Sequence, residues 1–106
     1  MEQKTPEYFS GLLVLNDTVL KMPYYLYILK SKSNDKFYTG ISLNPERRLE
    51  YHNSFEKGFT SRYRPWEIVF THKFNSKEEA LAAEKRIKSW KSKRMIVRII
   101  NGEISL

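Results

Sequence analysis

The chain has 106 residues, enough for one domain with a modest core, and its 41 % hydrophobic and 14 % aromatic content is typical of a globular protein. It has no cysteine, which excludes disulfides and thiolate metal sites, its two histidines have no zinc spacing, and no apolar run approaches the roughly 18 residues that span a bilayer. The net charge is +7 and the N-terminus lacks a signal-peptide pattern, so we expect a soluble, cytoplasmic protein.

Residues 1–22 differ in character from the rest of the chain. A polar start is followed by the apolar run at 9–15 (FSGLLVL), which predicts a short edge strand, and Asn16-Asp17 would end it. No motif with a chemical role falls in this segment. We therefore expect residues 1–22 to form a poorly ordered appendage and residues 23–101 to form the folded domain.

The next two segments have the composition of strands joined in a hairpin. Residues 24–31 (YYLYILKS) are rich in aromatic and β-branched side chains, and residues 36–42 (KFYTGIS) follow a short polar stretch. The pair Asn34-Asp35 suits the positive φ angles of a tight turn. A hairpin centred on this pair would bring Tyr27 and Tyr38 close together across the two strands.

Tyr38 and Gly40 are the unusual positions of the second strand. With a side-chain period of two, one face carries Phe37, Thr39 and Ile41, and Tyr38 lies on the other. Strand interiors usually avoid glycine, so Gly40 predicts a bulge, a bend or a close approach of another group.

A helix is predicted over residues 45–55. Asn44 is a preferred N-cap residue, and Pro45 suits the first turn. Arg48 and His52 are four positions apart, so they share one face of this helix.

The segment after this helix, KGFTSRYRP at 57–65, is predicted to be a basic, aromatic loop. It could contact a nucleic-acid backbone or stack on bases, and alternatively it is simply anchored to the core by Trp66. A third strand is predicted over residues 66–74 (WEIVFTHKF).

A second helix is predicted over residues 77–90, with Ser76 as its N-cap and Glu79 completing a capping box. Its buried stripe consists of Ala80, Ala83, Ile87 and Trp90. Glu84 lies at the margin of this stripe, where a carboxylate is costly unless it is paired or bound to a metal ion. Glu84 is therefore either a metal ligand or the partner of a nearby arginine in a salt bridge.

The C-terminal part holds the whole excess of positive charge. A final helix is predicted over residues 92–100. From residue 85 to residue 98 there is no acidic side chain, while the basic ones are Lys85, Arg86, Lys88, Lys91, Lys93, Arg94 and Arg98. The rest of the chain carries equal numbers of acidic and basic residues. Such an unmixed block indicates a polyanionic partner, and nucleic acid fits it best.

Taken together, these residues resemble the GIY-YIG nuclease family. Residues 25–27 (Tyr-Leu-Tyr) stand where the first triad of that family belongs, and residues 38–40 (Tyr-Thr-Gly) stand where the second does. The family's arginine lies ten positions after the tyrosine of the second triad, which corresponds to Arg48, and His52 follows four positions later. Its metal-binding glutamate corresponds to Glu84, within EALAAEKRIK.

The resemblance implies an α/β (α+β) fold with a small three-stranded antiparallel sheet flanked by helices, as in the small single-domain branch related to the excinuclease C N-terminal domain. It also implies a divalent-metal-dependent endonuclease that hydrolyses phosphodiester bonds in DNA, in DNA repair or in processing structured DNA. Glu84 would hold a single Mg²⁺ (or Mn²⁺) ion, and Arg48 would contact the scissile phosphate. Tyr27, Tyr38 or His52 would position the attacking water or take its proton, and these three alternatives stay open.

A further set of residues is predicted to contact the nucleic acid. Gly40 would let the chain pass close to the substrate backbone. The other members are basic side chains of the 57–65 loop and of the C-terminal block: Arg62, Arg64, Lys88, Lys91 and Arg94.

The sequence also departs from the family pattern. The first triad lacks its glycine, Ile41 replaces the lysine that often follows the second triad, and Ile96 stands where an active-site asparagine is found, with Asn101 as a weak substitute. Two other hypotheses therefore stand beside the nuclease. One is a catalytically weak or inactive nucleic-acid-binding module on the same fold, and the other is an unrelated small basic RNA-binding protein, whose usual glycine-rich clamp or paired aromatics the sequence lacks.

Overall fold

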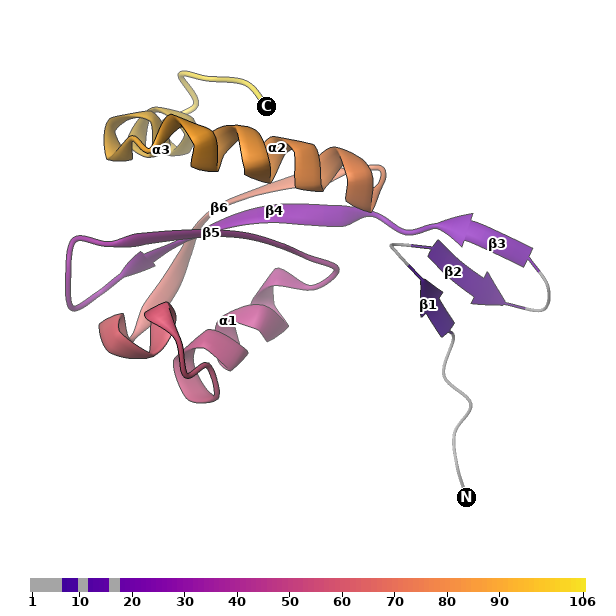
Figure 1. The fold of residues 1–106 in the computed structure, drawn as a ribbon, viewed down its shortest axis with the longest axis horizontal. Helices are drawn as coiled ribbons and strands as arrows, with labels where there is room; N and C mark the ends of the chain where they lie inside the picture. The colour runs from indigo at the N-terminus through magenta and orange to yellow at the C-terminus, as the bar shows by residue number, and fades with distance from the viewer. Residues whose placement is uncertain (1–6, 10–11, 16–17) are drawn as a thin grey trace.

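β4 (Tyr24–Ser31) is the central strand of a three-stranded antiparallel sheet, with β5 (Phe37–Ser42) on one side and β6 (Trp66–Phe74) on the other (Figure 1). The computed structural model describes residues 7–9, 12–15 and 18–106, with side chains from Met22 onward. The three strands lie where the sequence pattern predicts them, and their antiparallel pairing confirms the predicted fold class.

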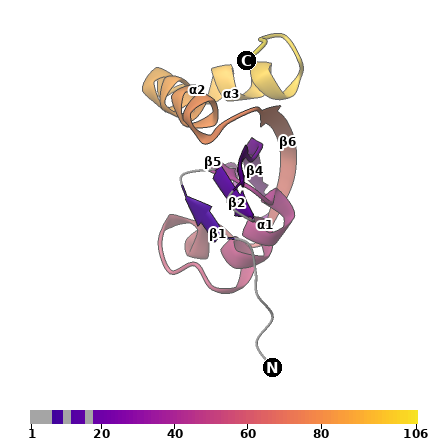
Figure 2. The same ribbon diagram turned by 90° about the vertical axis from the view of Figure 1, so that its right-hand side faces the viewer.

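Helices cover both faces of this sheet (Figure 2). α1 (Pro45–Ser54) packs on one face, and α2 (Lys77–Trp90) lies with α3 (Lys93–Ile100) on the other. All three helices begin and end within one residue of the predicted positions. The predicted loop after α1 is wrong in one respect, because Phe59–Tyr63 form a 3₁₀ helix, η1.

The alternation of β4 sends its side chains into two separate cores. The core under α2 and α3 contains Leu26, Ile28, Ala83, Ile87 and Ile99. The core under α1 contains Tyr27, Leu29 and Trp66. Because β4 is buried on both faces, a shift of its register by one residue would exchange the two sets, and the packing therefore fixes which side chains face α1.

The β4–β5 hairpin turns one residue earlier than the sequence predicts. Its register centres the turn on Ser33-Asn34 instead of Asn34-Asp35. The Ser31 hydroxyl holds the turn by accepting the backbone N–H groups of Ser33 and Asn34, at 3.1 and 3.0 Å. The predicted positive φ at Asn34 and Asp35 is wrong, since a longer turn closed by a serine side chain requires no left-handed residue.

Each of the three helices begins at a residue whose side-chain oxygen accepts the N–H group three positions later. The three caps are Asn44, Ser76 and Ser92, with donor–acceptor distances of 3.1, 3.3 and 3.2 Å. The second half of the predicted capping box differs, because the Glu79 carboxylate accepts the N–H group of Asn75 instead of that of Ser76.

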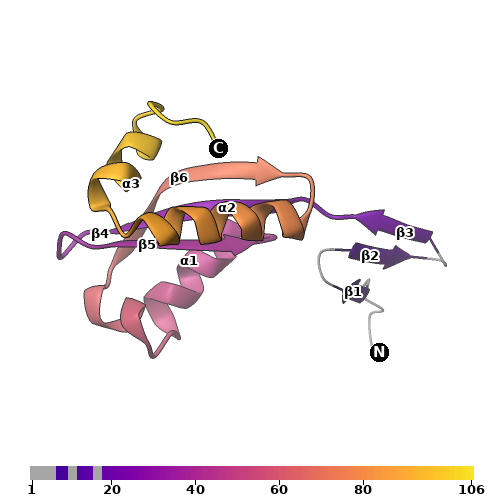
Figure 3. The same cartoon turned by 45° about the horizontal axis from the view of Figure 1, so that its top comes forward.

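A second antiparallel sheet lies beyond the N-terminal end of β4 (Figures 1 and 3), built from β1 (Glu7–Phe9), β2 (Leu12–Leu15) and β3 (Thr18–Lys21). The predicted single edge strand at 9–15 is wrong, since β2 pairs with a strand on each side. The sequence also predicts poor order in residues 1–22, and part of that segment, residues 1–6, 10–11 and 16–17, lies outside the described residues. The predicted domain boundary between residues 22 and 23 stays a prediction.

The structure holds no candidate membrane span in its described part, where every helix is too short or too polar to cross a bilayer.

Candidate active site

Tyr27 and Tyr38 lie on the face of the sheet that α1 covers. Tyr27 is directly opposite Gly40 in the strand register, which makes Tyr38 its diagonal neighbour. The ring centroids are 6.2 Å apart, which confirms the predicted proximity of the two tyrosines. Tyr27 is 1 % exposed, whereas Tyr38 is only partly buried, so the pair reaches from the core to the surface.

His52 reaches this pair from α1 and is fully buried. Its Nε2 atom lies 2.9 Å from the Tyr27 hydroxyl oxygen, and its ring centroid lies 4.6 Å from that of Tyr38. Its Nδ1 atom lies 3.0 Å from the hydroxyl oxygen of Thr60 on η1. No local pattern in the sequence distinguishes Thr60 from its neighbour Ser61, so sequence reasoning misses this contact.

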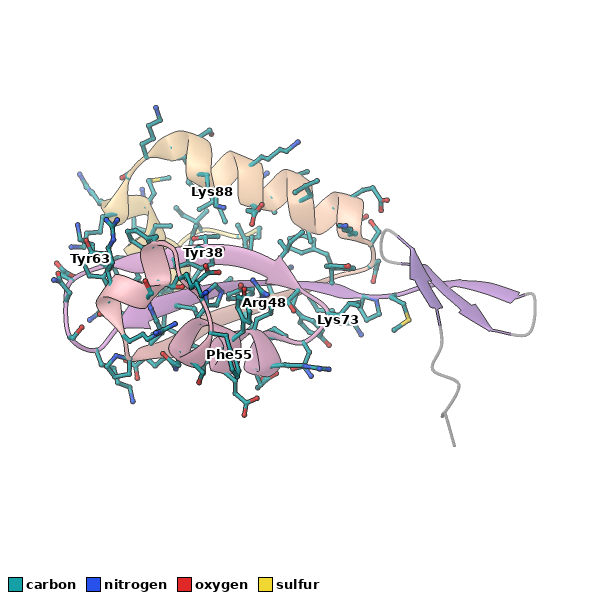
Figure 4. All side chains as sticks on the ribbon, turned by 60° about the horizontal axis from the view of Figure 1, so that its bottom comes forward. Tyr38, Arg48, Phe55, Tyr63, Lys73 and Lys88 are labelled. Carbon is teal, nitrogen blue, oxygen red and sulfur yellow. The ribbon has the colours of Figure 1, made fainter. Side chains whose placement is uncertain are left out.

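Arg48 stands one helical turn before His52 and is half-buried. Its guanidinium carbon lies 4.5 Å from the centroid of the Tyr51 ring. Figure 4 shows Arg48 and Tyr38 in the same part of the molecule. Arg48 and His52 are four residues apart on α1, as the sequence predicts, and the Arg48 charge affects the pKa of both tyrosines.

Burial keeps the three candidate proton acceptors uncharged at neutral pH. It raises the pKa of Tyr27 to about 12, against the opposing effect of the nearby Arg48 guanidinium. Burial likewise raises the pKa of Tyr38, which Arg48 also opposes. The pKa of His52 falls to about 4, first because of burial and second because of the nearby Arg48 charge. Arg48 thus favours the phenolate form of both tyrosines, but burial outweighs its effect.

Gly40 is buried, and its missing side chain makes room for Tyr27. A Cβ atom at this position would lie 2.6 Å from the Tyr27 hydroxyl oxygen and 2.7 Å from its Cζ atom. The group that approaches Gly40 closely is the tyrosine directly across the strand pair, and the contact of Gly40 with a substrate backbone stays a prediction.

Glu84 belongs to α2, on the other face of the sheet, but its charge affects the pKa of the same two tyrosines. α2 packs against the edge strand β5, and the Glu84 charge adds to burial in raising the pKa of Tyr27 and Tyr38. Its carboxylate lies 3.5 Å from Lys88 Nζ, and that ammonium lies 5.8 Å from the centroid of the Tyr38 ring (Figure 4). The alternative of an arginine partner is wrong, because the salt bridge forms with a lysine one turn along the same helix.

The donor chemistry at Glu84 fits a single Mg²⁺ ion. Within residues 7–9, 12–15 and 18–106, no group of three or more His, Cys, Asp or Glu side chains could enclose a metal ion. Mg²⁺ does not need such a group, because it commonly binds one or two carboxylates together with substrate phosphates and keeps several waters. The Glu84 side chain is 15 % exposed, which leaves part of its carboxylate open to solvent, and Lys88 competes for it.

A cavity of about 540 Å³ opens beside Arg48. Arg47 and Lys77 add two more cationic side chains to its lining, and the rings of Tyr24 and Tyr51 add aromatic surface. Sequence reasoning misses Arg47 and Lys77, although Arg47 adjoins Arg48 in the chain. A basic, aromatic concave surface next to the candidate site is typical of nucleic-acid contact.

The other predicted nucleic-acid contacts differ in their availability. The exposed ones are Arg62, Lys88, Lys91 and Arg94. Arg64 is engaged inside the protein, since its Nε donates to the carbonyl oxygen of His52 at 2.7 Å and another guanidinium nitrogen donates to that of Glu56. Arg64 thus holds the C-terminal end of α1, where carbonyl groups lack helical partners, and its contact with nucleic acid stays a prediction.

Residues 23–96 match the family model of the GIY-YIG catalytic domain. Similar proteins include a UPF0213 protein of Streptococcus agalactiae, 37 % identical over 67 residues that are 62 % of this chain and 75 % of that one. A UPF0213 protein of Staphylococcus haemolyticus is 38 % identical over 68 residues, 63 % of this chain and 82 % of that one.

Two further comparisons extend this list. The structure-specific endonuclease subunit slx1 of Pyrenophora tritici-repentis is 43 % identical over 51 residues, but these are 43 % of this chain and 14 % of that much longer protein. Among solved structures, a UPF0213 protein of Bacillus halodurans matches with 32 % identity and a TM-score of 0.49, covering 76 % of this chain and 84 % of the other.

Proposed function

The chain belongs to the GIY-YIG catalytic domain family, and from this premise we propose that it is a divalent-metal-dependent endonuclease that hydrolyses phosphodiester bonds in DNA. The observation that carries the proposal is the cluster of Tyr27, Tyr38, Arg48 and His52, joined electrostatically to Glu84. These five side chains come from four different elements, and ordinary packing does not require a charged carboxylate and a guanidinium near one buried and one partly buried phenol.

Each member of the cluster has a task in such a reaction. Arg48 would hold the scissile phosphate with its planar guanidinium, and its charge would stabilise the negative charge that develops there. Tyr27 and Tyr38 would orient the attacking water, and one of them would accept its proton once its own proton has left. Their pKa values, raised by burial, would have to fall when substrate and cation bind.

Glu84 would hold the cation. A single Mg²⁺ or Mn²⁺ ion bound there would supply positive charge to the phosphate and make water a better nucleophile. Its binding would displace Lys88 from the Glu84 carboxylate and free that lysine, 5.8 Å from the Tyr38 ring, to contact DNA.

The substrate class we propose is structured DNA, as in repair. Support comes from the similarity to slx1, a structure-specific endonuclease subunit, and from the basic, aromatic cavity lined by Arg47, Arg48 and Lys77. The excess charge of the C-terminal block supports a nucleic-acid partner of either kind.

One observation favours a catalytically inactive nucleic-acid-binding module as the second candidate. Ile96, which stands at the position of the family's asparagine, packs against the core of Leu26 and Ile99, while Asn101 is exposed at the end of α3. The amide that the family has at this place is therefore not supplied by either residue.

The test is cleavage of labelled linear, nicked and branched DNAs, with a single-stranded RNA beside them, in Mg²⁺ and in EDTA. We expect metal-dependent cutting of at least one DNA, and its loss in Arg48→Ala. Tight binding of all substrates without cutting in Mg²⁺ or Mn²⁺ would select the inactive module instead.

A further inference from the structure

Thr60 ends a buried chain of hydrogen bonds that runs from the candidate site into the domain. His52 links the two ends of this chain, with Nε2 2.9 Å from the Tyr27 hydroxyl and Nδ1 3.0 Å from the Thr60 hydroxyl. Tyr27, His52 and Thr60 are 1 %, 0 % and 1 % exposed. The backbone of Thr60 is held as well, because the buried Trp66 ring donates its N–H group to the Thr60 carbonyl oxygen at 2.7 Å.

The number of protons in this chain allows two arrangements. A neutral imidazole carries one N–H group, and each hydroxyl carries one proton. In the first arrangement, Thr60 donates to Nδ1 of His52, and the Nε2–H group donates to the Tyr27 oxygen. In the second, the Nδ1–H group of His52 donates to Thr60, and Tyr27 donates to Nε2.

The surroundings of the two hydroxyls favour the first arrangement. Among the residues that the structure describes, His52 Nδ1 is the one hydrogen-bond partner of the Thr60 hydroxyl. The second arrangement would bury the Thr60 proton without an acceptor, which is costly. The first arrangement leaves the Tyr27 proton without a partner in the described part of the free protein, where Tyr27 is 1 % exposed. The Tyr27 ring centroid lies 6.2 Å from that of the partly exposed Tyr38, so a phosphate oxygen bound at the candidate site would be the acceptor for this proton.

We propose that Thr60 is a positioning residue that holds His52 as its Nε2–H tautomer, so that His52 donates to Tyr27 and cannot accept the Tyr27 proton. The Tyr27 oxygen then receives a hydrogen bond from the His52 ring, and the nearby Arg48 guanidinium opposes the effect of burial on the Tyr27 pKa. Donors around a phenol oxygen favour its ionised form. This removes His52 from the three candidates for accepting the proton of the attacking water.

The meaning of this tautomer for catalysis rests on the proposed endonuclease function, but the tautomer itself does not. It can be measured in metal-free protein without DNA, by NMR of the imidazole nitrogens after ¹⁵N labelling of histidine. The chain has two histidines, and His72→Gln assigns the signals. We expect a protonated Nε2 and an unprotonated, hydrogen-bonded Nδ1 in His52. A protonated Nδ1 would overturn the proposal.

Variants separate the effect of Thr60 from that of Tyr27. In Tyr27→Phe the tautomer should persist, because Thr60 sets it from the other side of the ring. In Thr60→Val, Nδ1 should lose its hydrogen bond and its ¹⁵N resonance should move toward that of a free acceptor nitrogen, whereas Thr60→Ser should keep the wild-type signal. A tautomer that changes in Tyr27→Phe would contradict control by Thr60.

A second readout connects Thr60 to the reaction. Cleavage should fall about tenfold or more in Thr60→Val, with unchanged DNA affinity in EDTA, and Thr60→Ser should restore it. Ser61→Ala is the matched control on η1, since the Ser61 hydroxyl bonds to the carbonyl groups of Lys57 and Gly58 and not to His52. Cleavage equal to wild type in Thr60→Val would refute the positioning role. Wild-type protein that never cuts would refute the endonuclease and leave the tautomer standing.

Discussion

His52 combines full burial with two ring hydrogen bonds to neutral hydroxyls, and this has a consequence for stability in acid. Burial and the Arg48 charge lower its pKa from 6.5 to about 4, against the opposing charge of Glu56 and with a smaller contribution from Arg64. Between about pH 6.5 and pH 4, His52 is therefore mostly protonated in the unfolded chain and mostly neutral in the folded chain. The stabilisation is complete above about pH 6.5 and is lost as the pH falls toward 4.

We therefore expect the free energy of unfolding to decrease by up to about 3 kcal/mol between pH 6.5 and 4 through His52. Urea unfolding at several pH values measures it, with His52→Gln and His72→Gln compared to wild type. The free energy of unfolding should change less steeply with pH in His52→Gln than in wild type, whereas His72→Gln should keep the wild-type slope. Equal slopes in all three proteins would show that His52 is protonated in the folded state.

Gly40 gives a second prediction at the same scale. In Gly40→Ala the new methyl group would lie 2.6 Å from the Tyr27 hydroxyl oxygen, so the ring must move and its bond to His52 must break or lengthen. We expect a loss of about 1–3 kcal/mol in stability and a strong loss of cleavage. Gly58→Ala is the control, because there the nearest atom is a flexible carboxylate oxygen of Glu56 at 3.3 Å. A Gly40→Ala protein as stable as Gly58→Ala would contradict this packing.

The residues of the site could be predicted from the sequence to different degrees. Tyr27, Tyr38, Arg48 and His52 follow from the resemblance and from local spacing, since helix and strand periods decide which side chains share a face. The role of Gly40 depends on the strand register, which places Tyr27 across from it. The contact of Thr60 with His52 depends on the packing of η1, which no sequence pattern of a few residues encodes.

Among the elements, those with strong local signals are predicted best. β4, β6 and α2 have the predicted bounds because their composition and caps are local properties. The hairpin turn is misplaced because the Ser31 side chain bonds to the turn backbone, which competes with the Asn-Asp signal. The Glu84–Lys88 salt bridge is predictable from the sequence, because oppositely charged residues four positions apart on a helix commonly pair, although the predicted partner is an arginine.

The basic block on α2 and α3 gives a prediction at the scale of elements. If it follows phosphates, DNA affinity should fall with salt at a log–log slope of roughly −0.9 per phosphate neutralised. Replacing Lys88, Lys91 and Arg94 with glutamine should make this slope shallower by up to about one per lost contact. Binding titrations at several salt concentrations measure it. The single variant Lys91→Gln is compared with Lys73→Gln, which changes an exposed lysine on β6 outside the block. Equal salt slopes of DNA affinity in these two variants would mean that the block is only a solvated face.

For the molecule as a whole, the domain boundary is testable. The family match begins at residue 23, and the two hydrophobic cores are built from residues 26 to 106. A chain that begins at Met22 should therefore fold, with a melting temperature within a few degrees of that of the full chain, and should keep cleavage. Calorimetry of both chains measures this, and an unfolded short chain would show that residues 1–21 belong to the domain.

The central claim is that Glu84 retains the catalytic cation. In Glu84→Gln the shape of the side chain stays, but the charge that binds the cation is removed. Because its partner Lys88 is a half-exposed residue four positions along the helix, the loss of the salt bridge should change stability by no more than about 0.5 kcal/mol. DNA affinity in EDTA should stay unchanged, since the basic block is untouched.

The most direct measurement is the nicking rate of Glu84→Gln in Mg²⁺, taken with the melting temperature of the same preparation. The exposed Glu78 on the same helix supplies the control Glu78→Gln. We expect the rate to fall about 10²-fold or more in Glu84→Gln at an almost unchanged melting temperature, and to match wild type in Glu78→Gln. A Glu84→Gln protein with a lowered melting temperature that still cuts at the wild-type rate would place Glu84 outside the site.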